Sequence, residues 1–251
     1  EEEEMFREAV RDFAQSEVAP LVFKMEEAQE IDPSLLPMLF ELGLMGIEVP
    51  EEFGGADSTF FTSVLVVEEL SRIDPSVGTL VDVQNTLVIN ALKCWGSDEL
   101  IARYFPLLAT EMVGAYALSE AGSGSDAFAL ICRATQDGDD WLLTGQNVFI
   151  SAYGREDYLP GPMMTDPDAP RHRNLGYFMV PNPAPGLVVN EMELLVGHRQ
   201  KAVFMDNLRV PSENLIGGDH EGWQVLGTHL EQEHGGRGRA FPNDKVADNL
   251  V

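Results

Sequence analysis

Apolar residues recur at three- and four-residue spacing through the first 112 residues of the chain, a pattern that predicts amphipathic helices. The clearest stretches are 6–18, 35–42, 60–70, 77–92 and 99–108. Pro33 stands before the second stretch and Gly43 directly after it, which is typical of a helix start and a helix end. Segment 49–55, with one proline and two adjacent glycines, is expected to be a loop between helices.

After Met112 the chain changes to short runs of strand-forming residues separated by glycine and proline turns. Strands are expected over 116–118, 128–134, 141–150, 177–180, 187–192 and 202–210. Within 158–164, Pro160 and Pro162 are expected to interrupt a central strand, because proline cannot donate a ladder hydrogen bond. From Gly222 the pattern is helical again, and an irregular tail is expected from Gly235 onward.

The order of these patterns predicts an α+β protein with three parts. Residues 1–112 are expected to form an N-terminal α-helical domain, and residues 113–220 a middle β domain built as a small barrel or sandwich. Residues 221–251 are expected to be the start of a C-terminal helical domain, the larger part of which is missing. The composition, 44% apolar and 23% charged, is that of a folded protein and supports packed elements throughout.

The chain is strongly acidic, with 16 basic residues against 42 acidic ones and a net charge of −26. Repulsion from phosphate backbones and anionic lipids argues against nucleic acid or a membrane as a general partner. No apolar run approaches the roughly 20 residues that cross a bilayer. Cys94 and Cys132 are too few for a disulfide framework and lack metal-ligand spacing, so we expect a reduced compartment and no metal site.

The most informative motif is Tyr-Ala-Leu-Ser-Glu-Ala-Gly-Ser-Gly-Ser-Asp at 116–126. A short apolar run enters a glycine-serine loop, in which Ser119, Ser123 and Ser125 supply hydroxyls. Such a loop exposes backbone N–H groups and side-chain donors in a concave nest, which suits phosphate or a polar cofactor edge. Taken alone, the glycines at 122 and 124 are more typical of a plain turn.

Three further segments carry a recognisable pattern: Gly-Leu-Met-Gly-Ile-Glu-Val-Pro-Glu-Glu-Phe-Gly-Gly at 43–55, the stretch 96–108 ending in Tyr-Phe-Pro-Leu-Leu, and Asp-Asn-Leu-Arg-Val-Pro-Ser-Glu-Asn-Leu-Ile-Gly at 206–217. Together with the loop at 116–126, they resemble the acyl-CoA dehydrogenase family. Helices followed by a small β domain are also the order of that family. Gln-Asn-Thr at 84–86 and Ser-Glu-Ala-Gly at 119–122 are most similar to its short/branched-chain members.

The resemblance implies FAD, bound in extended form between the β domain and helices. The implied cofactor-binding residues are Tyr116, Leu118, Ser119, Gly124, Ser125, Phe149, Ile150 and Ser151. Ser119 would donate near the pyrimidine edge of the flavin, and Ser125 near phosphate and substrate, which makes Ser125 the implied substrate-binding residue too. Ser151 would sit near N5, the hydride acceptor. Phe149 would cover a ring face, at a position where the family more often has Trp.

The reaction also needs a base, because a proton leaves the carbon next to the thioester carbonyl. A carboxylate suits this role when burial raises its pKa towards neutrality. Most family members place that glutamate in the C-terminal domain, but isovaleryl-type members place it on the first helix after the β domain. Leu-Glu-Gln-Glu-His at 230–234 then implies Glu233 as the catalytic residue. The alternative is an ordinary acidic helix face that includes Glu231, and His234 replaces the arginine usual in the family.

The resemblance thus implies FAD-dependent α,β-dehydrogenation of a short or branched-chain acyl-CoA, with electrons passed to an electron-transfer flavoprotein. A dimer or a homo- or heterotetramer is implied, in the bacterial cytoplasm or the mitochondrial matrix. One alternative is a non-catalytic subunit that pairs with a complete partner, supported by the missing third domain, by Phe149 and by the prolines of 158–164. A flavin monooxygenase on the same fold is a second alternative.

Overall fold

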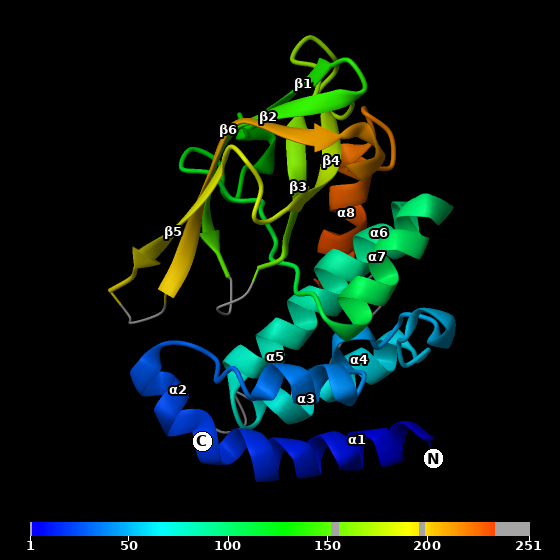
Figure 1. The fold of residues 1–251 in the computed structure, drawn as a ribbon, viewed down its shortest axis with the longest axis vertical. Helices are drawn as coiled ribbons and strands as arrows, with labels where there is room; N and C mark the ends of the chain where they lie inside the picture. The colour runs from blue at the N-terminus through cyan, green and yellow to red at the C-terminus, as the bar shows by residue number, and fades with distance from the viewer. Residues whose placement is uncertain (1, 152–155, 196–198, 234–251) are drawn as a thin grey trace.

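The expected helical stretches are all present in a computed structural model, which describes residues 2–151, 156–195 and 199–233 (Figure 1). Its helices are α1 (Glu2–Phe13), α2 (Val22–Ala28), α3 (Leu35–Glu41), α4 (Phe60–Ser71), α5 (Pro75–Asp82), α6 (Asn90–Trp95), α7 (Asp98–Thr110) and α8 (Gly222–Glu233). Side chains at three N-termini accept backbone N–H groups, as the cap preference predicts: Thr59 for α4, Asp74 for α5 and Ser97 for α7. The tail from residue 234 lies outside the described residues.

The strands of the described residues form one seven-stranded sheet, which confirms the expected β domain. They are β1 (Arg133–Asp137), β2 (Asp140–Ile150), β3 (Tyr158–Met164), β4 (Leu175–Pro181), β5 (Leu187–Glu193), β6 (Arg199–Pro211) and β7 (Leu215–Ile216). Their order is β5-β6-β2-β1-β3-β4-β7. All neighbours are antiparallel except β1 and β3, which share one parallel pair, Arg133 with Met164.

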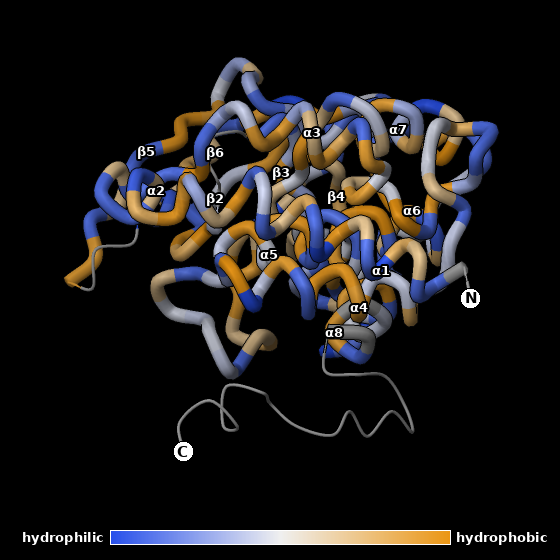
Figure 2. Tube along the Cα trace, turned by 90° about the horizontal axis from the view of Figure 1, so that it is seen from below, coloured by the Kyte–Doolittle hydropathy of each residue, from blue (hydrophilic) through white to orange (hydrophobic). Residues whose placement is uncertain are grey.

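Helices α1 to α7 fill one half of the molecule and the sheet the other, with α8 beside β4 and α6 (Figure 1). Seen from the helical end, hydrophilic and hydrophobic stretches alternate along the helices, as amphipathic packing requires (Figure 2). One apolar core lies inside the helical half. Side chains of the β domain form a second core, and a third joins α6, α7 and α8 to β4. No helix in the described ranges has the length and apolar character to span a membrane.

The prediction that prolines interrupt a strand at 158–164 is wrong, since this segment is the regular strand β3. Along a strand, successive backbone N–H groups point to opposite edges. Residues 158, 160 and 164 direct their backbone groups away from β4, towards segment 113–117 and Cys132. The missing N–H groups of Pro160 and Pro162 therefore fall on that edge, and the ladder with β4 stays complete from Tyr158 to Met164.

Two other predicted strands are not confirmed in full: 116–118 forms no strand, and of 128–134 only the last two residues belong to β1. The N–H groups of Ala115 and Ala117 donate to the carbonyls of Tyr158 and Pro160, but Pro160 has no N–H to return, so only an isolated bridge forms. Strand β1 begins only at Arg133, because a buried carboxylate takes the preceding backbone N–H groups, as described below. The expected strands over 141–150, 177–180, 187–192 and 202–210 are confirmed.

A buried glutamine on the π-helical segment Val83–Ile89 fixes the linker between the two halves. Gln84 Nε2 donates to the backbone oxygens of Leu108 (2.8 Å) and Met112 (2.9 Å), and its Oε1 accepts the N–H of Gly114 (2.9 Å). An unpaired backbone group here would cost about 1–3 kcal/mol. Gln84 therefore sets where the chain leaves α7 and enters the 116–126 loop.

An ion network joins α1 to α4. Glu69 is only 2% exposed, and its carboxylate accepts from Arg11 (2.9 and 3.0 Å) and Arg7 (2.7 Å), with Arg72 at 3.6 Å. The hydrogen bonds from Arg11, followed by the one from Arg7, lower the pKa of Glu69 from 4.5 to about 2, against the opposing effect of burial. The charged carboxylate is therefore much more stable in the folded chain than in the unfolded one.

Replacing Glu69 with Gln should destabilise the fold by roughly 2–3 kcal/mol at pH 7. Because the folded pKa is depressed, this stabilisation is present above pH 4.5 and is lost as pH falls towards 2. Urea unfolding at pH 7 and pH 3 should show the gap between wild type and Glu69→Gln shrinking at the lower pH. Glu68→Gln, at a more exposed carboxylate, is the control; an equal gap at both pH values for Glu69→Gln would contradict the assignment.

Candidate functional site

The first part of the 116–126 loop forms a bridge between two strands. The N–H of Ala117 donates to Pro160 of β3 (2.9 Å), and Ser119 accepts the N–H of Val148 in β2 (2.8 Å). Ser119 and the end of β2, 29 residues apart in sequence from Ser119 to Val148, are thus held side by side. Tyr116, Leu118 and Ser119 are half-buried in this bridge. The structure therefore brings the end of β2 and the triplet 149–151 beside segment 116–119. We call the surface formed by these two segments the wall.

Glu120 anchors the turn that follows. Its side chain is 7% exposed, and its two carboxylate oxygens accept the backbone N–H groups of Ile131 (2.7 Å) and Cys132 (2.9 Å). Burial, together with the neighbouring Glu120 charge, raises the pKa of the Cys132 thiol to about 12, so this thiol stays neutral. Glu120 was not among the residues predicted from the sequence. The available signal was a carboxylate at the start of a loop of small residues, since it can accept hydrogen bonds from several backbone N–H groups.

The rest of the loop only partly matches the predicted nest. Ser123 does not face outward: it is buried, and its hydroxyl donates to the backbone oxygen of Asp126 at 2.9 Å. That use within the turn corrects the expectation that Ser123 is a ligand donor. Gly124 and Ser125 are exposed, and a Cβ at Gly122 or Gly124 would meet nothing within 4 Å. The loop therefore leaves open space around an accessible backbone and the Ser125 hydroxyl.

The aromatic-X-Ser triplet ends β2. Phe149 has a φ of 59°, a left-handed conformation that is costly for a bulky side chain, and it is 56% exposed. Ile150 is buried in the sheet core, and Ser151 is half-buried. An aromatic ring held outward by a strained backbone is the kind of outlier that occurs at binding sites.

A basic and aromatic cluster that sequence analysis missed lies next to the loop. The rings of Phe128 and Trp223 stack with centroids 3.8 Å apart at 22°. Arg171 places its guanidinium 4.1 Å from the Phe128 ring centroid and pairs with Asp126 at 3.3 Å, and His172 meets the Phe128 ring edge-on. The detectable signal was Arg-His-Arg at 171–173, an unusual basic run in so acidic a chain.

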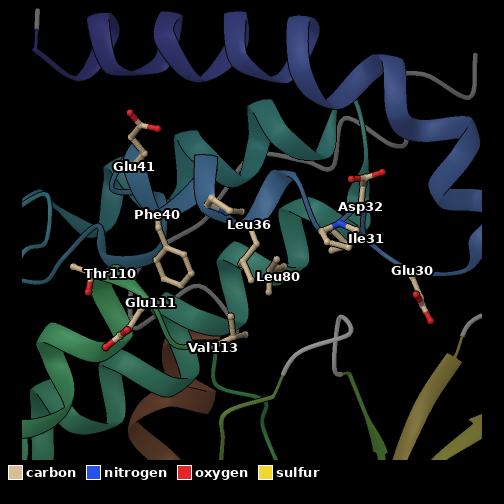
Figure 3. Close-up of a pocket in the computed structure, with 12 residues that line it drawn as sticks. Glu30, Ile31, Asp32, Leu36, Phe40, Glu41, Leu80, Thr110, Glu111 and Val113 are labelled. Carbon is tan, nitrogen blue, oxygen red and sulfur yellow. The ribbon is translucent and has the colours of Figure 1, made fainter.

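A cavity of about 850 Å³ lies in the helical half (Figure 3). Leu36 and Phe40 of α3, Leu80 of α5 and Val113 of the linker converge on it. The carboxylates of its lining, Glu41 among them, point away from this apolar centre. Val113 stands only three residues before Tyr116, so the cavity adjoins one end of the segment whose other end carries the basic cluster.

Glu233 is the last residue of α8, and its side chain lies outside the described part of the chain. The helix beneath it is firmly docked: Trp95 of α6 donates from Nε1 to Thr228 Oγ1 at 2.9 Å, and Val225 and Leu226 are fully buried. The next residue considered in the sequence, His234, is outside the described residues as well.

Comparison with known proteins identifies this arrangement. The N-terminal domain model of the acyl-CoA dehydrogenase family matches residues 1–112, and its middle domain model matches residues 115–208. The chain belongs to the acyl-CoA dehydrogenase family. Members of this family are FAD-dependent oxidoreductases of fatty acid and branched-chain amino acid metabolism.

Individual members of the family are similar to this chain. The mitochondrial short/branched chain specific acyl-CoA dehydrogenase of Bos taurus is 38% identical over 220 residues, 86% of this chain and 51% of that protein. An acyl-CoA dehydrogenase of Bacillus subtilis is 35% identical, covering 92% of this chain and 62% of that protein. The crystal structure of an acyl-CoA dehydrogenase from Geobacillus kaustophilus has a TM-score of 0.87 at 30% identity, covering 93% of this chain and 62% of that one. The chain spans about half the length of the mammalian relatives it matches.

The wall fits the cofactor of this family. It offers an exposed aromatic ring at Phe149 and hydroxyls at Ser119, Ser125 and Ser151. It also contains a buried acceptor, Oε1 of Gln200, for which no described residue supplies a donor. A flavin presents a flat ring for the aromatic face and polar edges for these hydroxyls, so the residue types present are chemically suited to FAD.

Proposed function

We propose that this chain carries the FAD wall of an enzyme that dehydrogenates short or branched-chain acyl-CoA thioesters between the α and β carbons. The observation that carries the proposal is the hydrogen bond from Val148 N–H to Ser119, because it unites the loop and the triplet in one surface. The bound flavin would supply the hydride acceptor. Electron-transfer flavoprotein is the proposed electron acceptor, in keeping with the family.

Each residue of the wall has a proposed role. Ser119 donates to the polar edge of the cofactor, where fixed donors stabilise negative charge that develops on reduction. Ser125 faces phosphate and substrate from the exposed loop, and Tyr116, Leu118, Gly124 and Ile150 shape the wall. Phe149 covers a ring face, and Ser151 donates near the reacting nitrogen. Glu233 is the proposed base.

The substrate would lie along segment 113–126. Its anionic CoA end suits the cluster at Arg171, His172 and Trp223, since cations and stacked rings recognise nucleotide phosphates and bases. Its acyl end suits the apolar cavity at Leu80 and Val113. Similarity to the short/branched chain specific enzyme of Bos taurus supports a short or branched acyl group.

We also propose three domains, which comprise residues 1–112, 113–220 and 221–251. We further propose that the protein is a dimer or tetramer in the cytoplasm or the mitochondrial matrix. The non-catalytic alternative loses one of its supports, because β3 is a regular strand despite its prolines. Phe149 still supports that alternative, and a measurement of flavin reduction distinguishes it from the enzyme.

The decisive experiment adds 2-methylbutyryl-CoA without oxygen to the purified protein and follows the yellow flavin absorbance. Bleaching that depends on the acyl-CoA is expected, together with formation of the enoyl-CoA. A bound flavin that stays oxidised would favour the non-catalytic alternative. Protein that retains no flavin would contradict the cofactor proposal itself.

A further inference from the structure

Strand β6 begins directly beside the end of β2. Ile150 pairs with Lys201 after a shift in register that starts at Asn147. This shift places Gln200 next to Ser151, and Gln200 Nε2 lies 3.3 Å from Ser151 Oγ. Gln200 is half-buried, so the contact forms inside the wall and is partly protected from water.

The chemistry of the two groups fixes the direction of this hydrogen bond. An amide nitrogen can only donate, whereas a serine hydroxyl has one donor and two acceptor positions. Ser151 Oγ is therefore the acceptor, and its own hydrogen is not used in the contact. No described residue accepts a hydrogen bond from Ser151, so this hydrogen is available to a ligand at the wall.

Gln200 carries a second sign of a missing ligand group. Its Oε1 atom is buried and has no hydrogen-bond donor among the described residues. A buried acceptor left without a donor is costly, and native proteins rarely keep one without a functional reason. The strained, exposed Phe149 stands two residues from Ser151 on the same strand end.

We propose that Gln200 is a positioning residue that makes Ser151 a hydrogen-bond donor towards a flavin ring nitrogen. By occupying an acceptor position of Ser151 Oγ, its amide turns the O–H outward to the bound ring. This inference rests on the proposed function, which places the flavin against Ser151.

The test compares binding of FAD and 5-deaza-FAD, in which the acceptor nitrogen N5 is replaced by C–H. Isothermal titration of the apoprotein with each compound gives an affinity ratio, which we expect to favour FAD. Gln200→Glu keeps the shape but replaces the donor with an acceptor, which would draw the Ser151 hydrogen inward. The ratio should then fall about tenfold, the effect of one hydrogen bond.

Using a ratio cancels the effect of the added negative charge, since it acts on both compounds. Gln146→Glu, an exposed position on β2, is the matched control and should leave the ratio unchanged. Ser151→Ala should abolish the preference and make Gln200→Glu silent in the double variant. Gln200→Met, which lacks both polar atoms, provides the same comparison if the charged variant does not fold.

The outcomes separate the two proposals. A wild-type protein that binds neither compound contradicts the flavin site itself. Normal binding in which Ser151→Ala removes the FAD preference but neither Gln200 variant does would overturn the role of Gln200 alone. A wild-type ratio of one would likewise overturn it, because Ser151 would then not donate to N5.

Discussion

Replacing Glu233 with Gln should lower the rate of flavin reduction by acyl-CoA by about 10²–10⁴-fold, the usual contribution of a general base. Gln keeps the shape and the hydrogen-bonding capacity of the side chain but cannot take the α-proton. Substrate binding should change little, because the change is confined to the proton-transfer step. Anaerobic stopped-flow measurement of flavin bleaching gives the rate, and titration with the acyl-CoA gives the affinity.

Glu231 stands two residues earlier on α8, and its side chain is exposed. Glu231→Gln is therefore the matched control and should reduce flavin at the wild-type rate. Near-normal turnover of Glu233→Gln would remove the assignment and move the base elsewhere.

Replacing Gly161 with Ala should destabilise the fold by about 3 kcal/mol and weaken flavin retention at the same time. A Cβ at this position of β3 would stand 2.1 Å from the backbone oxygen of Ala117. The backbone of segment 115–119 cannot remain at that distance, so the wall would have to move away from β3. Urea unfolding measures the first effect, and the flavin absorbance that survives gel filtration measures the second.

Gly122→Ala is the control from the same site. Its Cβ would meet nothing within 4 Å, so stability should change by no more than about 0.5 kcal/mol. This contrast separates a glycine that packing requires from one that it does not. If Gly161→Ala unfolds like wild type and retains its flavin, the close contact between β3 and the loop does not hold the wall in place.

The elements predicted correctly from the sequence are those whose conformation depends on neighbouring residues. The helical stretches and strands β2, β4, β5 and β6 follow from apolar periodicity, and the family follows from four separated motifs. Prediction failed where residues distant in sequence determine the backbone hydrogen bonds of a segment. Pro160 and Pro162 tolerate a central position because the edge they face does not belong to β4, and that edge is invisible in a linear pattern.

The candidate site shows the same division. The sequence by itself determined that a glycine-serine loop, an aromatic-X-Ser triplet and an acidic helix are present, because composition and spacing are local properties. Only the tertiary structure decided that the Ser123 hydroxyl donates within its own turn, that Glu120 anchors the loop, and that Gln200 donates to Ser151. The reason is physical: a hydrogen-bonding side chain takes whichever partner the fold brings within about 3 Å, and that partner is set by contacts far away in sequence.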